Sequence, residues 1–352
     1  MAAHMTNDPH IEPPHMLTLP DDLRRAIERA LAAVPAPSWL HAAQELSERY
    51  RGARPVNQQP LAAGAREALG YAALIMPATY AQLRGALAAT AARIPAWAPR
   101  TMLDLGSGPG TALWAASAQW STLDAMSAYE REPALIGLGR ELARESTVLA
   151  LRSARWERAD LRQATIAGTY DLVVLGHVLN ELDPDPRRRI VAAAWAATAG
   201  VLLIVEPGTA PAFEVVRAAR DELLAAGART LAPCAHDQPC PLVNDWCHFP
   251  QRLQRPEFQR RARQAPSPWE DSKFAYAAMA RFGPEAPIWG RVIREPTSNK
   301  AYAEVELSTR DGIMRYRALK RRREDFRRVK DLAWGQALSE PLSEEPSAPA
   351  ED

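Results

Sequence analysis

The stretch TMLDLGSGPGTALWAASAQW, residues 101–120, constrains the fold of this chain more than any other. Its pattern predicts a short apolar strand, a turn with three glycines at positions 106, 108 and 110, and a helix that begins near Thr111. Glycines allow a tight turn and let the backbone approach a ligand closely, with the positive end of a helix behind them. A strand, a glycine turn and a helix in this order are typical of nucleotide-binding α/β folds.

The sequence after this stretch alternates apolar strands with helical segments. The apolar stretches end at Glu130, Asp160, Gly176 and Gly208. This alternation predicts an α/β fold with a doubly wound parallel sheet that binds ligands at the carboxyl ends of its strands. An NAD-dependent dehydrogenase and a nucleoside-binding methyltransferase both fit. Glu130 lies 20 positions beyond Gly110 and could accept both ribose hydroxyls of a nucleoside.

The turn DLGSGPG resembles motif I of the class I S-adenosylmethionine-dependent methyltransferases, whereas a dinucleotide site more often has the sequence G-x-G-x-x-G. The resemblance implies a Rossmann-like doubly wound sheet and makes the dehydrogenase a remote alternative. It also implies a set of residues around the amino-acid end of the cofactor: Asp104, Gly106, Ser107, Gly108 and Gly110. Glu130 would then bind the ribose, and Asp160 the adenine amino group.

The segment GHVLNELDPDPRRR follows the fourth strand, where methyltransferases of this class place groups that face the substrate. His177 and Asn180 are therefore candidates for catalytic residues near the methyl acceptor. The alternative is an ordinary helix start, in which these two side chains cap the helix or bond to the backbone.

The three cysteines of the chain, Cys234, Cys240 and Cys247, lie within fourteen positions, and His236 and His248 lie among them. A disulfide framework is disfavoured because the chain is long and the cysteine count is odd. Thiolates grouped so closely with histidines indicate a metal site. The C-x5-C-x6-C spacing differs from the C-x2-C of zinc knuckles, which makes zinc the weaker alternative.

The remaining sequence divides by composition. An amphipathic helix is predicted over residues 20–34, the segment WLHAAQELSERYR repeats the pattern, and two Ala-rich helices should meet near Pro77. We expect four parts: an N-terminal helical domain (1–98), a methyltransferase-like domain (99–285) with a Cys-rich insertion at 233–252, a basic C-terminal β extension (286–335) and an acidic disordered tail (336–352). In the extension, STRDG predicts a hairpin turn, and a basic helix or strand end should follow.

Charge is unevenly distributed although the net charge is only +1. Residues 251–330 contain 20 Lys and Arg against 10 Asp and Glu, as expected for a protein that binds a phosphate backbone. A solvated amphipathic helix is the alternative origin of such a run. The candidates for contact with RNA are Lys320, Arg321, Arg322, Arg323, Arg327, Arg328 and Lys330.

The N-terminus has no pattern of a secretory signal, and no uninterrupted apolar run approaches about 18 residues. These features predict a soluble cytoplasmic protein, with a monomer as the default state and no contact with a membrane.

Several segments together resemble one family, the methyltransferase-like small-ribosomal-subunit assembly factors, which are bacterial relatives of a mitochondrial small-subunit protein. The resemblance rests on YAALIMPATYAQL, LDLGSGPGTALWAA, GHVLNEL, EPGTA, APCAHDQPCPL, DWCHFPQR and KFAYAAMAR. It implies a [4Fe-4S] cluster bound through four cysteines, a cytoplasmic protein associated with ribosomes, and small-subunit ribosomal RNA as the partner.

The chain departs from the family at the fourth cysteine, where the matching position is Ser308. Serine is a poor iron ligand beside thiolates. Three interpretations stay open: a cluster held by three cysteines with one weak corner, a Cys3His site that uses His236 or His248, or loss of the metal. Two functional classes follow: an enzyme that methylates ribosomal RNA, or a non-catalytic assembly factor that uses the fold and the cluster as an RNA-binding scaffold.

Overall fold

The computed structural model describes residues 16–51, 62–163 and 165–342. Four helices precede the sheet: α1 (Asp21–Ala32), α2 (Ala36–Arg51), α3 (Ala65–Leu74) and α4 (Met76–Ala91). The helices predicted around residues 20–34 and on both sides of Pro77 are confirmed. Pro77 stands in the first turn of α4, where its missing N–H costs no hydrogen bond.

The central sheet has the strand order β3-β2-β1-β4-β5-β8-β6, and β7 pairs with β8. Neighbours among β1 to β5 are parallel, whereas β8 is antiparallel to both β5 and β6. The predicted doubly wound sheet is thus confirmed. The strands are β1 (Thr101–Leu105), β2 (Ala125–Glu130), β3 (Arg155–Arg158), β4 (Tyr170–Gly176), β5 (Thr198–Pro207), β6 (Arg229–Ala232), β7 (Phe249–Gln254) and β8 (Trp269–Ala280).

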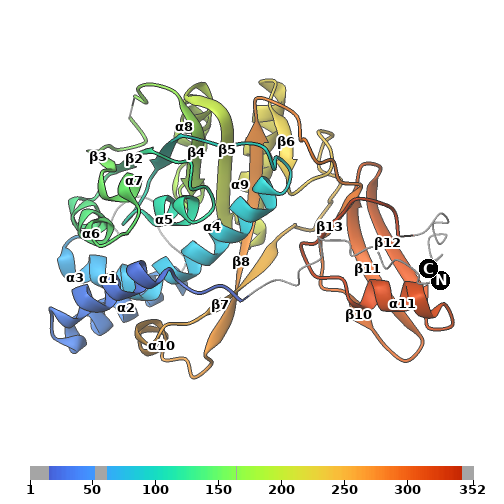
Figure 1. The fold of residues 1–352 in the computed structure, drawn as a ribbon, viewed down its shortest axis with the longest axis horizontal. Helices are drawn as coiled ribbons and strands as arrows, with labels where there is room; N and C mark the ends of the chain where they lie inside the picture. The colour runs from blue at the N-terminus through green and yellow to red at the C-terminus, as the bar shows by residue number, and fades with distance from the viewer. Residues whose placement is uncertain (1–15, 52–61, 164, 343–352) are drawn as a thin grey trace, which may run out of the picture.

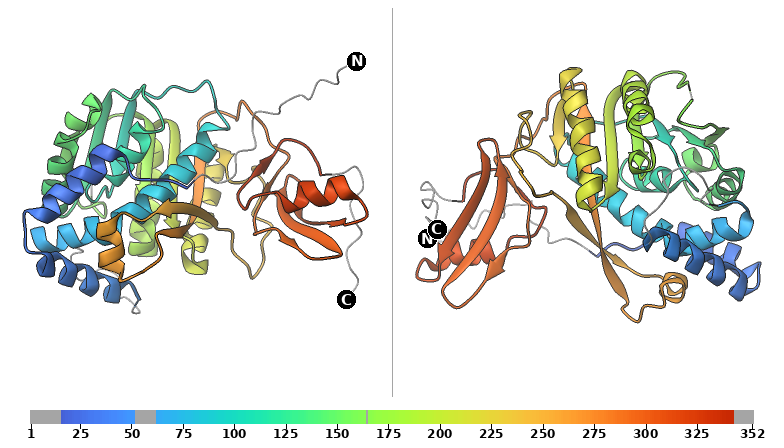
Figure 2. Two further views of the ribbon diagram at one scale, coloured as in Figure 1. Left: turned by 60° about the horizontal axis from the view of Figure 1, so that its bottom comes forward. Right: turned by 180° about the vertical axis from the view of Figure 1, so that it is seen from behind.

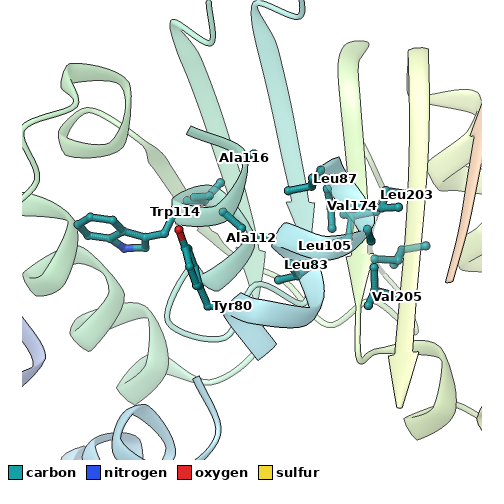
Figure 3. Packing of buried hydrophobic residues seen from close by; sticks show 14 of the residues in the cluster. Tyr80, Leu83, Leu87, Leu105, Ala112, Trp114, Ala116, Val174, Leu203 and Val205 are labelled. Atoms are coloured by element: carbon teal, nitrogen blue, oxygen red, sulfur yellow. The ribbon is translucent and has the colours of Figure 1, made fainter. Parts of the chain in front are cut away.

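Helices cover both faces of this sheet, as Figures 1 and 2 show. On one face, α4 packs against α5, and its Leu83 and Leu87 lie over Leu105, Val174 and Leu203 of the strands (Figure 3). On the other face, α8 packs against α9. Full burial of one such leucine stabilises the fold by about 1.5–3 kcal/mol. The helices are α5 (Thr111–Ser117), α6 (Pro133–Arg144), α7 (Leu149–Arg152), η1 (Leu179–Glu181), α8 (Pro184–Ala196), α9 (Ala210–Ala225) and α10 (Glu257–Arg263).

The directions of the strands decide where a site can form. Because β5 and β6 are both antiparallel to β8, they run parallel to each other. The carboxyl ends of β1, β2, β4, β5 and β6 therefore meet at one edge of the sheet. The glycine turn, the segment after β4 and the Cys-containing loop 233–248 all leave the sheet at this edge, where open α/β sheets bind ligands.

A second, five-stranded sheet forms the C-terminal part of the chain and lies beside the main body (Figure 1). It contains β9 (Gly290–Val292), β10 (Thr297–Ser298), β11 (Tyr302–Thr309), β12 (Gly312–Leu319) and β13 (Ala337–Leu338), and α11 (Arg323–Lys330) packs against β11 and β12. The pairing of Thr309 with Gly312 closes the predicted hairpin turn at Arg310 and Asp311.

One prediction fails in this part of the chain. The tail was expected to be disordered from residue 336, but β13 pairs with β9, and Leu338 and Leu342 are buried in the core of this sheet. Burial of these two leucines against the second sheet orders this part of the tail despite its acidic, Pro-rich composition. Residues 343–352 lie outside the described residues. No helix in the described ranges is long and apolar enough to cross a membrane.

Candidate functional site

The glycine turn between β1 and α5 is held in a conformation that only glycine adopts easily. Gly106, Gly108 and Gly110 have φ values of 73°, 54° and 82°. A Cβ on Gly106 would lie 2.4 Å from the Val178 side chain, and one on Gly110 would lie 2.8 Å from the Trp156 ring. A Cβ on Gly108 would meet the hydroxyl and ring of Tyr71 at 3.7–3.9 Å, an ordinary van der Waals contact, so this position is the least crowded of the three.

Glu130, at the end of β2, fixes the turn. Its carboxylate accepts hydrogen bonds from the backbone N–H of Gly108 and of Glu132, both at 2.8 Å. Backbone N–H groups of Gly106 and Ser107 also donate to the Tyr129 carbonyl, at 2.8 and 3.0 Å. An ionised carboxylate can accept about four hydrogen bonds, so Glu130 keeps capacity for ribose hydroxyls.

Asp104, at the end of β1, is buried and unusual. It is only 2% exposed, and its Oδ2 atom has no hydrogen-bond partner among the described residues. Burial, with Glu130 nearby, raises the pKa of Asp104 to about 8. A buried polar atom without a hydrogen-bond partner is costly in a protein core. At a ligand site, such an atom indicates a group whose hydrogen bond the ligand supplies.

Asp160 lies on the same edge, shortly after β3, but its carboxylate is not free. Arg162 donates to it through Nε at 2.9 Å, and this contact lowers the pKa of Asp160. Its predicted role at the adenine amino group stays a prediction, and Arg162 would have to share the carboxylate with the ligand.

His177 begins the segment after β4 in a left-handed conformation, with φ at 60°. Its Nε2 lies 2.6 Å from the Gln82 side chain of α4. Burial lowers the pKa of His177 to about 4, so the ring is neutral at physiological pH. The side chain of Asn180 forms no hydrogen bond within the described residues. Neither side chain caps η1 or α8, whose N-caps are Val178 and Asp183, and the roles of His177 and Asn180 stay predictions.

Glu206, at the end of β5, was not singled out as a site residue from the sequence. It is fully buried, and its Oε1 accepts a hydrogen bond from the Leu179 N–H at 2.7 Å. Its Oε2 has no partner among the described residues, and burial raises the pKa to about 8. Its only sequence signal was a carboxylate at the end of an apolar strand. Gln82 had none, because it lies in an Ala-rich helix whose contacts come from distant segments.

The three cysteines line one pocket at the edge of β6. Ser308 of β11 lines the same pocket, whereas His236 and His248 do not. The ring of His248 instead stacks on Trp246 and meets Trp334 edge-on. Within the described ranges, no group of three or more His, Cys, Asp or Glu side chains is arranged as a metal site. The structure thus brings Cys234, Cys240, Cys247 and Ser308 to one pocket without showing a metal centre.

Arginines surround this pocket and bind the backbone of the Cys-containing loop. Arg220 donates to the carbonyls of His236 and Gln238, and Arg291 of β9 donates to the carbonyl of Pro233. Arg294 forms an ion pair with Asp245. Burial raises the pKa of the Cys234 thiol, while the positive charges of Arg220 and Arg291 oppose this shift. Positive charge close to thiols favours their thiolate form, which is the form that binds metal.

The predicted RNA-binding residues lie on and before α11 and are exposed. None of the seven forms an ion pair with another described residue: Lys320, Arg321, Arg322, Arg323, Arg327, Arg328 and Lys330. Arg315 and Arg317 of the neighbouring β12 do form ion pairs, with Glu304 and Glu306. Arg328 donates a hydrogen bond to the Leu342 carbonyl at 3.4 Å, and the other six side chains form no hydrogen bond or ion pair within the described ranges.

The strand order, with β8 reversed between β5 and β6, and the glycine turn that faces Glu130 together define a protein with the class I methyltransferase fold. Comparison of the sequence with known protein families identifies the family. The model of one family, described as mitochondrial small ribosomal subunit Rsm22, matches residues 65–339, and the chain belongs to this family.

A curated relative is the human "Ribosome assembly protein METTL17, mitochondrial", which is 27% identical over 289 residues. The alignment covers 77% of this chain and 62% of the relative, so the chain spans less than two thirds of the relative's length.

Solved structures with a similar fold include the magnesium protoporphyrin IX methyltransferase from Synechocystis, with a TM-score of 0.39 and 12% identity. The N-methyltransferase NodS from Bradyrhizobium japonicum has a TM-score of 0.37 and 13% identity. Each comparison covers 68% of this chain and 97% of the other. The fold assignment rests on the strand order of the chain itself.

The buried carboxyl of Glu206 predicts a specific dependence of stability on pH. Its pKa is about 8 in the folded protein and about 4.5 in the unfolded chain. The stability that the protonated carboxyl contributes is therefore fully present below about pH 4.5 and is lost as the pH rises toward 8. For Glu206→Gln we expect the free energy of unfolding to fall less steeply over this range than in the wild type, by about 1.4 kcal/mol per pH unit. Urea denaturation at several pH values measures both slopes. Glu222→Gln, an exposed control on α9, should keep the wild-type slope, and identical slopes for Glu206→Gln and the wild type would disprove the assignment.

Proposed function

We propose that the protein binds S-adenosylmethionine at the glycine turn and acts on the small ribosomal subunit through contact with its ribosomal RNA. The observation that carries the proposal is the convergence of the glycine turn, Glu130 and Asp104 at the carboxyl edge of a class I methyltransferase sheet. Family membership and a relative named as a ribosome assembly protein support the ribosome as the partner. Cytoplasmic location, ribosome association and a monomeric state are part of this proposal.

The residues at the turn suit the cofactor. Gly108 is the least crowded glycine of the turn, and the unpaired Oδ2 of Asp104 offers a hydrogen-bonding group for the amino-acid end. Glu130 has acceptor capacity left for the ribose. When bound, S-adenosylmethionine supplies an activated methyl group; the chain holds it and places an acceptor against it.

Within this proposal the enzyme is favoured over the non-catalytic scaffold. The specific observation is that His177 lies after β4 as a neutral, strained residue whose side chain serves no cap. Backbone strain of this kind is retained mostly where function requires it. The scaffold remains the second candidate, supported by the unpaired cations around α11.

We also propose that the Cys-lined pocket holds an iron–sulfur cluster through Cys234, Cys240 and Cys247, with Ser308 in the place of a fourth ligand. Three thiols and the surrounding arginines suit an anionic cluster, and neither candidate histidine lines the pocket. Because Ser308 belongs to the C-terminal sheet, the cluster would join the Cys-containing loop to the sheet that bears α11. Zinc is the alternative metal.

The first prediction concerns the cofactor. Glu130→Ala removes both the anchor of the Gly108 N–H and the ribose acceptor, so we expect at least about a tenfold weaker affinity for S-adenosylmethionine, or about 1.4 kcal/mol, in isothermal titration calorimetry. Glu157→Ala, an exposed carboxylate on the neighbouring β3, should bind like the wild type. Equal affinity for both variants, or no binding by the wild type, would refute the site. If Glu130→Ala loses the cofactor but still supports small-subunit maturation, the protein acts as a non-catalytic scaffold and not as an enzyme.

A second prediction concerns the metal. Anaerobically purified protein should contain iron and acid-labile sulfide with a broad visible absorption, and Cys240→Ala should lose all three. Ser308→Cys adds a fourth thiolate at the pocket, so its absorption should decay more slowly in air than that of the wild type. Zinc without sulfide, or no metal at all, contradicts the cluster. Equal decay in air contradicts the position of Ser308.

A third prediction concerns RNA. The double variant Arg321→Ala/Arg327→Ala removes two unpaired cations, and Arg315→Ala/Arg317→Ala removes two cations that are paired with glutamates. Each lost phosphate contact should lower the slope of log affinity against log salt by about 0.7–0.9. We expect this loss only in the first variant, measured by fluorescence anisotropy with a small-subunit RNA fragment at several salt concentrations. The proposal fails if both variants lose the same amount, since net charge alone would then explain binding.

A further inference from the structure

A buried polar network joins α4, β8 and the segment after β4. At its centre is Gln82, whose amide nitrogen donates to the Ser272 hydroxyl at 2.9 Å and to the Lys273 carbonyl at 3.0 Å. Its amide oxygen lies 2.6 Å from Nε2 of His177. Gln82 and Ser272 are each only 8% exposed, so water competes little for these hydrogen bonds.

The contacts fix the orientation of the Gln82 amide. The carbonyl of Lys273 can only accept a hydrogen bond, so the group that faces it must be the amide nitrogen. Ser272 uses its own hydrogen toward the Ala78 carbonyl, at 3.4 Å, and therefore also accepts from Gln82. The amide oxygen is left facing His177. This assignment follows from the network and does not depend on seeing hydrogen atoms.

The orientation of Gln82 determines the tautomer of His177. An amide oxygen only accepts hydrogen bonds, so Nε2 of the neutral ring must carry the hydrogen and Nδ1 must be the unprotonated atom. Within the described ranges the His177 side chain has no other hydrogen-bond partner, and the residue is half-buried. Its left-handed backbone is a strained conformation for a residue with a side chain.

We propose that Gln82 is a positioning residue that fixes His177 as the Nε2–H tautomer, and thereby presents Nδ1 as a hydrogen-bond acceptor at the carboxyl edge of the sheet. The ligand class that this atom recognises is an N–H or O–H group, such as the exocyclic amine or the ribose hydroxyl of a nucleotide. A ligand that offers only acceptor atoms at this point would meet the lone pair of Nδ1 and be rejected. The ligand class rests on the proposed function, whereas the tautomer does not.

The test is nitrogen NMR of the ¹⁵N-histidine-labelled full chain, without cofactor or RNA. The chain has seven histidines, and the signal that disappears in His177→Gln assigns this one. We expect the wild-type ring to show one tautomer, with Nε2 protonated and its proton protected from solvent exchange. In Gln82→Leu the ring should shift toward the averaged signals of a freely exchanging imidazole, and the protection should be lost.

Ser272→Ala is the matched control. It removes one partner of the Gln82 amide but leaves the Lys273 carbonyl to orient it, so the tautomer and the protection should persist. If Gln82→Leu does not fold, Gln82→Asn, whose side chain is too short to reach His177, takes its place. A wild-type ring protonated on Nδ1, or a ring unchanged by the loss of Gln82 in a folded protein, would overturn the inference. Failure of S-adenosylmethionine binding would affect only the proposed function, because this measurement uses no ligand.

Discussion

The common direction of six strands, β1 to β6, is the constraint on which both candidate sites depend. The strands β1 to β5 pair in parallel, and β8, antiparallel to both β5 and β6, makes β6 run in the same direction as β5. Every loop that follows these strands must therefore emerge at the same edge. The glycine turn, the segment at His177 and the Cys-containing loop are far apart in sequence, yet the sheet delivers them to one side of the molecule.

Two buried carboxyls lie at this edge of the sheet. Asp104 and Glu206 are carboxyls with almost no exposed surface, and each has one oxygen without a partner among the described residues. A core that served only stability would have replaced such groups with apolar side chains, because their burial favours the neutral acid and costs free energy. Glu206 has a visible structural task, since it holds the N–H of Leu179 in the turn beside His177. The cost of burying it is therefore linked to the geometry of the segment after β4.

The sequence was sufficient to predict features that depend on residues close together in the chain. Glycine spacing located the turn, and the distance along the chain from Gly110 to Glu130 identified the carboxylate that binds it. The tautomer-fixing contact of Gln82 was beyond sequence reasoning, because its three partners come from β8 and from the turn after β4. The short strands β6 and β13 were missed for the same reason: strands of so few residues exist only through pairing with a distant neighbour.

The Cys-containing loop shows how sequence proximity and spatial proximity diverge. His236 and His248 stand among the cysteines in the sequence, but the first is turned toward its own backbone and the second is packed between tryptophans. Ser308 is distant in the sequence, and yet β11 carries it to the pocket because its neighbour β9 is tied to the loop through Arg291. The same arginine contacts, with those of Arg220, give the loop a scaffold of hydrogen bonds that does not require metal. In small metal-binding domains the metal supplies most of the folding energy. Here the guanidinium groups of Arg220 and Arg291 already hold the backbone of the loop. The conformation of the loop therefore does not depend on a metal in the pocket.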